Sequence, residues 1–355
     1  MRFGREMGIT LRELAQDLGL SPTTVSRALN GYPEVAEDTR WRVMEAARRL
    51  NYRPNTRAKS LATGRAQAIG HVIPVSAKHQ IVNPVFADFI AGAGESYARA
   101  GYDMVLTVVA DDDEAQAYRD LVGRGTVDGM IVHGPRQHDP RIPLLRELEI
   151  PFLVHGRSSG ITAPYSWLDI NNRRGFTRAA DALLDLGHRR IALINGLEDM
   201  DFAIRRREGY LDALQARAVR ADPALMVAAE MTETNGYRAA CRMLEMDNPP
   251  SAFLVSSILL AIGVRHALWD AGMHLGREVS VITHDDDLSY LKNGDAVPLF
   301  TATRSSVREA GRLAADMLLD LVADPASGPV TRLLEVDLIV GRSTGPCPES
   351  TRKSA

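Results

Sequence analysis

The sequence predicts an α/β protein with a small helical domain at its N-terminus and a larger body of two lobes. Two observations predict this class. Between residues 10 and 50, apolar residues recur at helical spacing in three short stretches. From residue 68 onward, short apolar runs alternate with amphipathic stretches, a pattern typical of doubly wound parallel sheets with helices on both faces.

Length and composition restrict the class of protein. The chain has 355 residues, 45% hydrophobic and 25% charged, and at roughly 100–200 residues per domain it should form two or three globular units. It has no run of 18 apolar residues, so we expect no membrane span. Its start lacks the features of a secretory signal, and its two cysteines, Cys241 and Cys347, fit a reducing compartment. We therefore expect a cytoplasmic protein.

Charge is distributed unevenly along the chain, although the net charge is only −3. Residues 1–65 contain 12 Lys and Arg against 7 Asp and Glu, whereas the remaining residues contain 30 against 38. A basic N-terminal segment on an acidic body favours a polyanionic partner for that segment alone. A chance excess of surface arginine is the alternative.

The first two helices are predicted by their end signals. Thr10 followed by Glu13 is a capping box, and Gly19 ends the helix that the box begins. Ser21 then caps a second helix, and Pro22 suits its first turn because no amide hydrogen is needed there. Since only three residues separate the two helices, they must meet at a steep angle as a helix-turn-helix. A third helix is predicted over residues 37–50.

The second helix has one apolar face and one polar face. Its polar face consists of Pro22, Thr23, Thr24, Ser26 and Arg27. Short polar side chains with an arginine suit a helix that lies in the major groove of DNA and contacts phosphates and base edges. The alternative is a small helical bundle that binds protein.

Residues 55–66 form a short basic segment after the third helix. Ala58 and Leu61 lie on one side of it, and Arg57 and Lys59 are nearby. A stretch of this length is not a stable helix in water, so we expect it to become ordered against DNA or against its copy in a dimer. An exposed leucine beside basic residues can wedge into a minor-groove step. The alternative is an ordinary linker.

The body is predicted to form two doubly wound lobes with a cleft between them, where ligand loops lie at the carboxyl ends of the strands. The last two apolar runs are expected to cross back between the lobes. The predicted domains are a helix-turn-helix at 1–54, a hinge at 55–66, lobe 1 at 67–168 and 299–325, lobe 2 at 169–298 and 329–345, and a tail at 346–355. The body alone would also fit a periplasmic binding protein, but the missing signal peptide and the N-terminal helices argue against that.

The chain resembles the lactose/galactose-repressor (LacI/GalR) family of bacterial transcription regulators. The resemblance is carried by TLRELAQDLGLSPTTVSRALNG, by LNYRPN and RAKSLA, and in the body by NPVF, GYDMVL, DGMIVHG, LGHRRIALI, RRREGY and VSVITHDD. It implies that Pro22, Thr23 and Arg27 read the major groove and that Leu61 is a minor-groove wedge. Asn30 and Asn55 match positions that contact the DNA backbone, with Thr10 and Ser21 beside them. Ala36 departs from the family, which usually has a capping serine or threonine there.

The resemblance also implies a small effector bound between the lobes. Arg206 aligns with the family's effector-binding arginine, Asp285 with its carboxylate partner, and Phe86 with a ring or apolar contact. Ser257 and Gly156 replace two polar residues that are common in the family. The further pocket candidates are His155, Arg157, Ser257, Trp167 and Asp169. Buried charges that bind hydroxyls and an aromatic that packs on a ring are typical of sugar sites.

Several motifs are most similar to repressors of α-glucoside uptake operons: HGR, YSWLDINN, INGLE, LVSS and ITHDDD. The resemblance therefore implies a cytoplasmic, nucleoid-associated homodimer that binds a palindromic operator and a small sugar. No metal spacing, cofactor loop or nucleophile–base pair is evident, so we expect no cofactor and no catalysis. Two alternatives stay open: an enzyme with a doubly wound fold, and an architectural DNA-binding protein that has lost its effector.

Overall fold

The computed structural model describes residues 9–29, 31–52, 65–74, 83–110 and 113–348. The chain divides into two compact units, residues 1–66 and residues 67–355. Six candidate DNA-binding residues lie outside the described residues: Asn30, Asn55, Arg57, Ala58, Lys59 and Leu61. No helix in the described part of the chain is long and apolar enough to cross a membrane.

The N-terminal unit contains helices α1 (Leu11–Leu18), α2 (Pro22–Leu29) and α3 (Glu37–Arg49). Thr10 and Glu13 form the expected capping box, in which the Glu13 amide donates to the Thr10 hydroxyl at 3.3 Å and the Thr10 amide donates to the Glu13 carboxylate at 2.6 Å. Gly19 ends α1 with a left-handed backbone, at φ 65°, that glycine adopts without strain. Ala36 begins α3 without a side-chain cap, because a methyl group cannot accept a hydrogen bond.

One apolar cluster holds these three helices together. Its buried members are Leu14, Ala15, Val25, Ala28, Val43, Ala46 and Ala47. Within each helix they are adjacent or lie three or four residues apart, so each helix turns one stripe inward. The polar face of α2 is thereby left on the outside.

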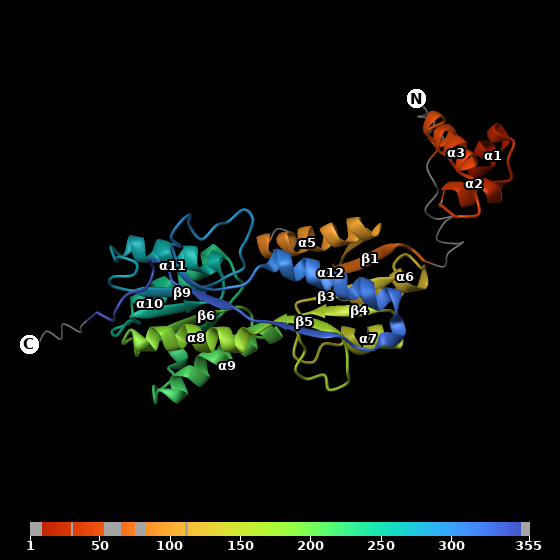
Figure 1. The fold of residues 1–355 in the computed structure, drawn as a ribbon. Helices are drawn as coiled ribbons and strands as arrows, with labels where there is room; N and C mark the ends of the chain where they lie inside the picture. The colour runs from red at the N-terminus through yellow and green to blue at the C-terminus, as the bar shows by residue number, and fades with distance from the viewer. Residues whose placement is uncertain (1–8, 30, 53–64, 75–82, 111–112, 349–355) are drawn as a thin grey trace, which may run out of the picture. The chain divides into compact units, whose positions relative to one another are not determined.

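The body consists of two six-stranded sheets (Figure 1). The first has the order β11-β5-β4-β3-β1-β2, and all of its pairs are parallel. Its strands are β1 (Ala68–Pro74), β2 (Asp103–Val109), β3 (Gly129–His133), β4 (Phe152–His155), β5 (Trp167–Ile170) and β11 (Thr331–Leu334).

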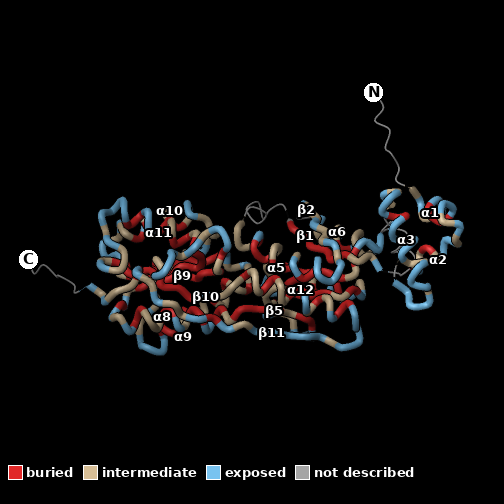
Figure 2. Tube along the Cα trace, turned by 45° about the horizontal axis from the view of Figure 1, so that its top comes forward, coloured by how far each residue is buried: buried red, intermediate tan, exposed pale blue. Residues whose placement is uncertain are grey.

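The second sheet has the order β12-β10-β9-β8-β6-β7 and is parallel except for the pair β10–β12. Its strands are β6 (Ile191–Asn195), β7 (Met226–Ala228), β8 (Ala252–Val255), β9 (Ser280–Asp285), β10 (Thr301–Arg304) and β12 (Asp337–Ile339). Strands in the middle of both sheets are buried (Figure 2). This burial explains why they appear in the sequence as continuous apolar runs.

Helices cover both sheets. In the first lobe, α5 (Pro84–Ala100) packs along α12 (Val307–Ala323), and α6 (Glu114–Gly123) and α7 (Arg141–Glu147) pack against each other. In the second lobe, α8 (Asn172–Asp185) pairs with α9 (Asp201–Ala216), and α10 (Glu233–Leu244) pairs with α11 (Ile258–Asp270), on opposite sides of the strands in Figure 1. Two short 3-10 turns, Pro223–Leu225 and Pro325–Ser327, complete the elements.

A glycine allows α5 and α12 to approach closely. A Cβ atom added at Gly92 would lie 2.0 Å from the carbonyl oxygen of Arg308 on α12. Gly92 lies within α5, so its missing side chain serves the packing of the two helices.

The crossing segments differ from the prediction. We expected residues 299–325 in the first lobe, but β10 pairs with β9 in the second sheet and only α12 returns to the first lobe. The apolar run 333–340, predicted as one strand of the second lobe, is split into β11 of the first sheet and β12 of the second. Hydrophobicity alone does not show which sheet has an unpaired edge, so the sequence could not make this assignment.

Candidate functional site

The polar face of α2 is accessible as the sequence predicts. Pro22, Thr23 and Arg27 are exposed, whereas Thr24 and Ser26 are half-buried. Ser21 accepts from the Thr24 amide at 3.0 Å, and the two hydroxyls lie 2.8 Å apart, so both side chains are already engaged at the helix start. Arg27 makes no ion pair within the described part of the chain, which leaves its guanidinium available to a ligand.

Other arginines of the N-terminal unit have structural roles. Arg49 on α3 donates to Asp17 on α1 at 2.6 Å, and Arg40 donates to the carbonyl of Tyr32 at 2.8 Å. These contacts fix α3 and the loop before it. Some of the positive charge of this unit is therefore used in internal contacts, and only the rest is available to a polyanionic partner.

Arg206 lies at the centre of the candidate effector site. This residue of α9 is 6% exposed. Its Nε donates to the side-chain oxygen of Asn172 at 2.7 Å, and its Nη1 donates to the carbonyl of Ser256 at 2.5 Å. The guanidinium lies 5.1 Å from the ring of Phe176 and 5.0 Å from that of Phe202. The two hydrogen bonds and the two phenylalanine rings thus hold the guanidinium in one orientation.

The charge of Arg206 has no direct carboxylate partner among the described residues. Burial lowers the pKa of Arg206 to about 10, and the more distant charges of Asp286 and Asp169 oppose this shift. A guanidinium has five N–H donors, and the two contacts above use only part of them. The remaining donors are fixed in place by the protein and are free to bind a ligand.

Asp286 contributes negative charge near Arg206. Asp285 ends β9, accepts from the Asp287 amide at 2.9 Å and lies opposite Arg304 in the strand register. Asp286 is 8% exposed and lies 3.4 Å from Nε2 of His284. Burial opposes its ionisation, but the contact with His284 and the charge of Arg206 keep its pKa below the usual value.

The expected pairing of Asp285 with Arg206 stays a prediction, because no direct contact joins either aspartate to Arg206 among the described residues. Sequence reasoning missed Asp286, Asn172 and Ser256. The run of three aspartates from Asp285 was the available signal, but it does not show which carboxylate points inward.

Three of the other candidates form one polar cluster. Nε of Arg157 donates to Asp169 at 2.7 Å, and its guanidinium lies 4.9 Å from the Trp167 ring. Burial raises the pKa of Asp169, and Arg157 partly offsets the rise. Because Asp169 also influences Arg206, this cluster belongs to the same electrostatic environment as the guanidinium.

Phe86 and His155 belong to an aromatic group in the first lobe. The ring of His155 stacks on Phe89 with centroids 4.2 Å apart, and Phe86 meets His133 edge-on at 5.1 Å. Burial lowers the pKa of His155 to about 4, so the ring is neutral near pH 7. Ser257 has a different role, because its hydroxyl caps α11 and accepts from the Leu260 amide at 3.3 Å.

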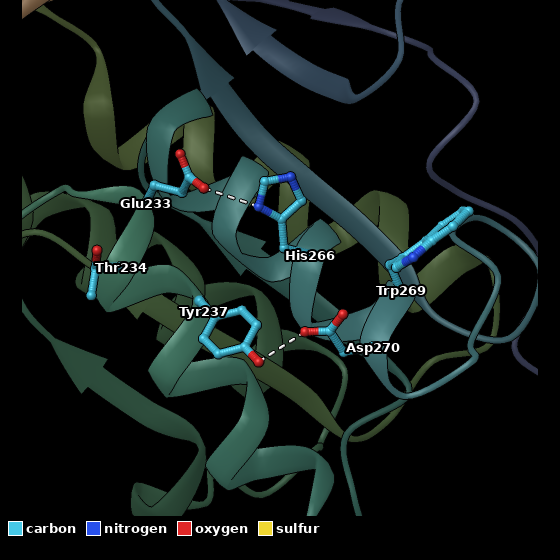
Figure 3. Close-up of a pocket in the computed structure, with 6 residues that line it drawn as sticks. All are labelled: Glu233, Thr234, Tyr237, His266, Trp269 and Asp270. Carbon is cyan, nitrogen blue, oxygen red and sulfur yellow. Dashed lines mark hydrogen bonds and ion pairs between the residues drawn. The ribbon is translucent and has the colours of Figure 1, made fainter.

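A separate hollow lies on the outer side of the second lobe, between α10 and α11 (Figure 3). It has a volume of about 400 Å³ and is lined by Glu233, Thr234, Tyr237, His266, Trp269 and Asp270. In it, the Tyr237 hydroxyl donates to Asp270 at 2.9 Å, and Glu233 lies 2.9 Å from Nδ1 of His266. Trp269 is 80% exposed.

Comparisons with known proteins decide the family. Residues 10–55 match the profile described as "Bacterial regulatory proteins, lacI family", and residues 180–344 match a periplasmic binding protein-like domain. The HTH-type transcriptional regulator AglR of Rhizobium meliloti is 45% identical over 97% of this chain and 96% of its own length. The chain belongs to the lacI family of bacterial regulatory proteins.

Other lacI-family proteins support this assignment. The HTH-type transcriptional regulator RafR of Escherichia coli is 36% identical over 91% of this chain and 95% of its own length. A CelR–cellobiose complex matches with a TM-score of 0.71 and 27% identity, over 94% of this chain and 99% of that one. A lac repressor dimer bound to operator and the anti-inducer ONPF matches with a TM-score of 0.81 and 25% identity, over 95% and 99%.

The family assignment confirms the predicted fold class and the helix-turn-helix. This lacI-family protein is a DNA-binding transcription regulator, because its full-length relatives are HTH-type transcriptional regulators. The alternative of an enzyme with a doubly wound fold is therefore wrong.

Proposed function

We propose that this regulator is a repressor whose affinity for a palindromic operator is controlled by a small sugar, an α-glucoside, bound at Arg206. The observation that carries the proposal is the buried guanidinium of Arg206, which is fixed by Asn172 and Ser256 and has no direct carboxylate partner among the described residues. A buried charge of this kind is costly without a ligand. Sugar hydroxyls are neutral and can accept its remaining hydrogen bonds.

The surrounding residues suit a sugar. Asp286 and Asp169 supply carboxylates that accept from hydroxyls, and Trp167 provides an aromatic face that can pack on a ring. Phe86, His155, Arg157, Ser257 and Asp285 remain in the proposed ligand set from sequence reasoning. A relative of similar fold is a complex with cellobiose, which supports a sugar as the ligand class.

DNA binding is assigned to the exposed face of α2 and to the segment after α3. We propose base and phosphate contacts for Pro22, Thr23 and Arg27 because all three are exposed. The further DNA contacts proposed in this unit are Thr10, Ser21, Thr24 and Ser26. The proposed contacts outside the described residues are Asn30, Asn55, Arg57, Ala58, Lys59 and Leu61, with Leu61 as the minor-groove wedge.

Two serine–aspartate contacts join the lobes and can sense a change in the angle between them. On one side, the amide and hydroxyl of Ser289 donate to Asp88 of α5 at 2.7 and 2.6 Å. On the other, the amide of Ser159 donates to Asp201 of α9 at 3.0 Å, and its hydroxyl donates to the same oxygen. A ligand that favours a different lobe angle must break or form such contacts, and this can change how the DNA-binding segments are held.

The test is reciprocal binding of sugar and DNA. We expect maltose to weaken binding of the full chain to DNA from upstream of its own gene by about 5–150-fold, the range for a coupling of 1–3 kcal/mol. The same DNA must weaken maltose binding by the same factor. Fluorescence anisotropy and calorimetry measure the two effects, with mannitol as the control. If no maltose-type sugar changes operator affinity, the architectural DNA-binding alternative replaces this proposal.

We also propose that the protein is a homodimer, as a palindromic operator requires two copies related by a two-fold axis. Figure 2 places α10, α11 and β2 along one side of the body. Trp269 on α11 is 80% exposed, and Leu106 and Val108 on the edge strand β2 are 45% and 48% exposed. Exposed apolar groups of this size favour a contact with a second copy.

The dimer contact is tested by charge substitution. The double variant Trp269→Glu and Leu106→Glu should be a monomer in light scattering at micromolar concentration, because each added carboxylate would be buried without a partner. Val340, 72% exposed and outside these elements, provides the control variant Val340→Glu, which should stay a dimer. A dimeric double variant would place the contact elsewhere.

A further inference from the structure

Three polar aromatic side chains are connected by hydrogen bonds in the interior of the first lobe. The hydroxyl of Tyr97 on α5 lies 3.3 Å from Nε2 of His71, and Nδ1 of His71 lies 2.9 Å from Nε2 of His133. Tyr97 is 1% exposed, His71 0% and His133 6%. His71 pairs with Ile131 in the register of β1 and β3, so His133, two residues further on, lies on the same side of the sheet.

The far end of this chain lies among the proposed effector contacts. His133 meets Phe86 edge-on at 5.1 Å and lies 6.0 Å from His155, its partner in the register of β3 and β4. Its Nδ1 has no hydrogen-bond partner among the described residues, and the side chain keeps a small exposure. A polar atom that is almost buried and lacks a partner should have one when the site is occupied.

The direction of the chain follows from the hydroxyl of Tyr97. Burial raises the pKa of Tyr97, so the phenol keeps its proton. His71 is its only hydrogen-bond partner in the described structure, and a buried O–H that donates to nothing is costly. Tyr97 must therefore donate to Nε2 of His71. Burial also lowers the pKa of His71 to about 3, so this ring has one proton, which lies on Nδ1.

The proton of His133 is then determined as well. Since Nδ1 of His71 donates to Nε2 of His133, the latter nitrogen is an acceptor. Burial and the neighbouring histidines lower the pKa of His133, so its ring is neutral and its single proton lies on Nδ1. The free nitrogen of His133 is a hydrogen-bond donor.

We infer that Tyr97, His71 and His133 form an oriented hydrogen-bond chain that makes Nδ1 of His133 a donor to the effector. This inference rests on the proposed function. His133 would select effectors that present an oxygen acceptor at this point, and Tyr97 and His71 would act as positioning residues. His71 would thus contribute to specificity although it contacts His133 and not the effector.

The first test measures the position of the protons without any ligand. Long-range ¹H–¹⁵N correlation spectra of histidine-labelled full-length protein distinguish Nδ1–H from Nε2–H rings, and His71→Gln and His133→Gln variants assign the signals. We expect both rings to be protonated on Nδ1 alone. Tyr97→Phe should give mixed forms of both rings. Tyr118, also fully buried in the first lobe, provides the control variant Tyr118→Phe, which should leave both signals unchanged. An Nε2–H form of His133 in the wild type reverses the chain and overturns the inference.

The second test measures recognition. Tyr97→Phe should lower maltose affinity by about fivefold to tenfold, the effect of one hydrogen bond of about 1 kcal/mol, whereas Tyr118→Phe should not. Maltose analogues in which one hydroxyl is replaced by fluorine or by hydrogen locate the contact. At one position the fluoro analogue should bind more tightly than the deoxy analogue, because fluorine can accept a hydrogen bond and hydrogen cannot. That difference should vanish in His133→Phe. Equal maltose affinity of Tyr97→Phe and Tyr118→Phe would overturn the selective role. If the wild type binds neither maltose nor its analogues, the proposed function is overturned instead. The spectra would then still test the direction of the hydrogen-bond chain.

Discussion

Replacing Arg206 by glutamine should abolish the effect of maltose on operator binding, while the sugar-free protein should keep its operator affinity within about twofold. The physical reason is that the donors of Arg206 are fixed at the site by Asn172 and Ser256, far along the chain from α2. A buried hydrogen bond to a charged group contributes about 1.5–3 kcal/mol, and several are lost together. Operator titrations at increasing maltose concentration measure the effect.

Controls separate loss of binding from loss of folding. Glutamine keeps much of the volume of Arg206, so the cavity is smaller than an alanine would leave. Arg207, its half-exposed neighbour on α9, pairs with Glu198 at 3.3 Å, and Arg207→Gln should keep the full maltose response. Circular dichroism checks that both variants are folded. If Arg206→Gln still releases DNA at the wild-type maltose concentration, the effector site lies elsewhere.

Arg27→Ala should cost about 1–3 kcal/mol in operator binding and much less in binding to random DNA, as expected for an arginine that reads a base edge. Arg27 is exposed on α2 and has no ion pair within the described residues, so its guanidinium reaches DNA without breaking a protein contact. Competition titrations with operator and scrambled duplexes at one salt concentration give the two losses.

The matched control is Arg12→Ala, which removes the same charge from the exposed surface of α1. A phosphate contact there would weaken all DNA about equally and reduce the salt dependence by about one ion. Equal losses on operator and random DNA for Arg27→Ala would reassign Arg27 to phosphate binding.

The sequence by itself determined the local structure and the family. The capping box of Thr10 and Glu13, the left-handed end at Gly19 and the exposed face of α2 depend on residues within four positions of one another. Interactions over so short a distance are visible in the order of residues alone. The apolar runs also located most strands, because strands buried on both faces contain few polar residues. Two short strands, β5 and β7, were not predicted as strands.

Only the tertiary structure decided which distant residues meet. It assigned β10 to the second sheet and divided the last apolar run between both sheets, since strand partners are chosen by free edges and not by composition. It placed the buried carboxylate of Asp286 where its charge acts on Arg206, which the run of three aspartates could not show. It also joined Tyr97, His71 and His133 across 26 and 62 residues of sequence. Their chemistry arises from burial and mutual orientation, and neither property is encoded in the spacing of residues along the chain.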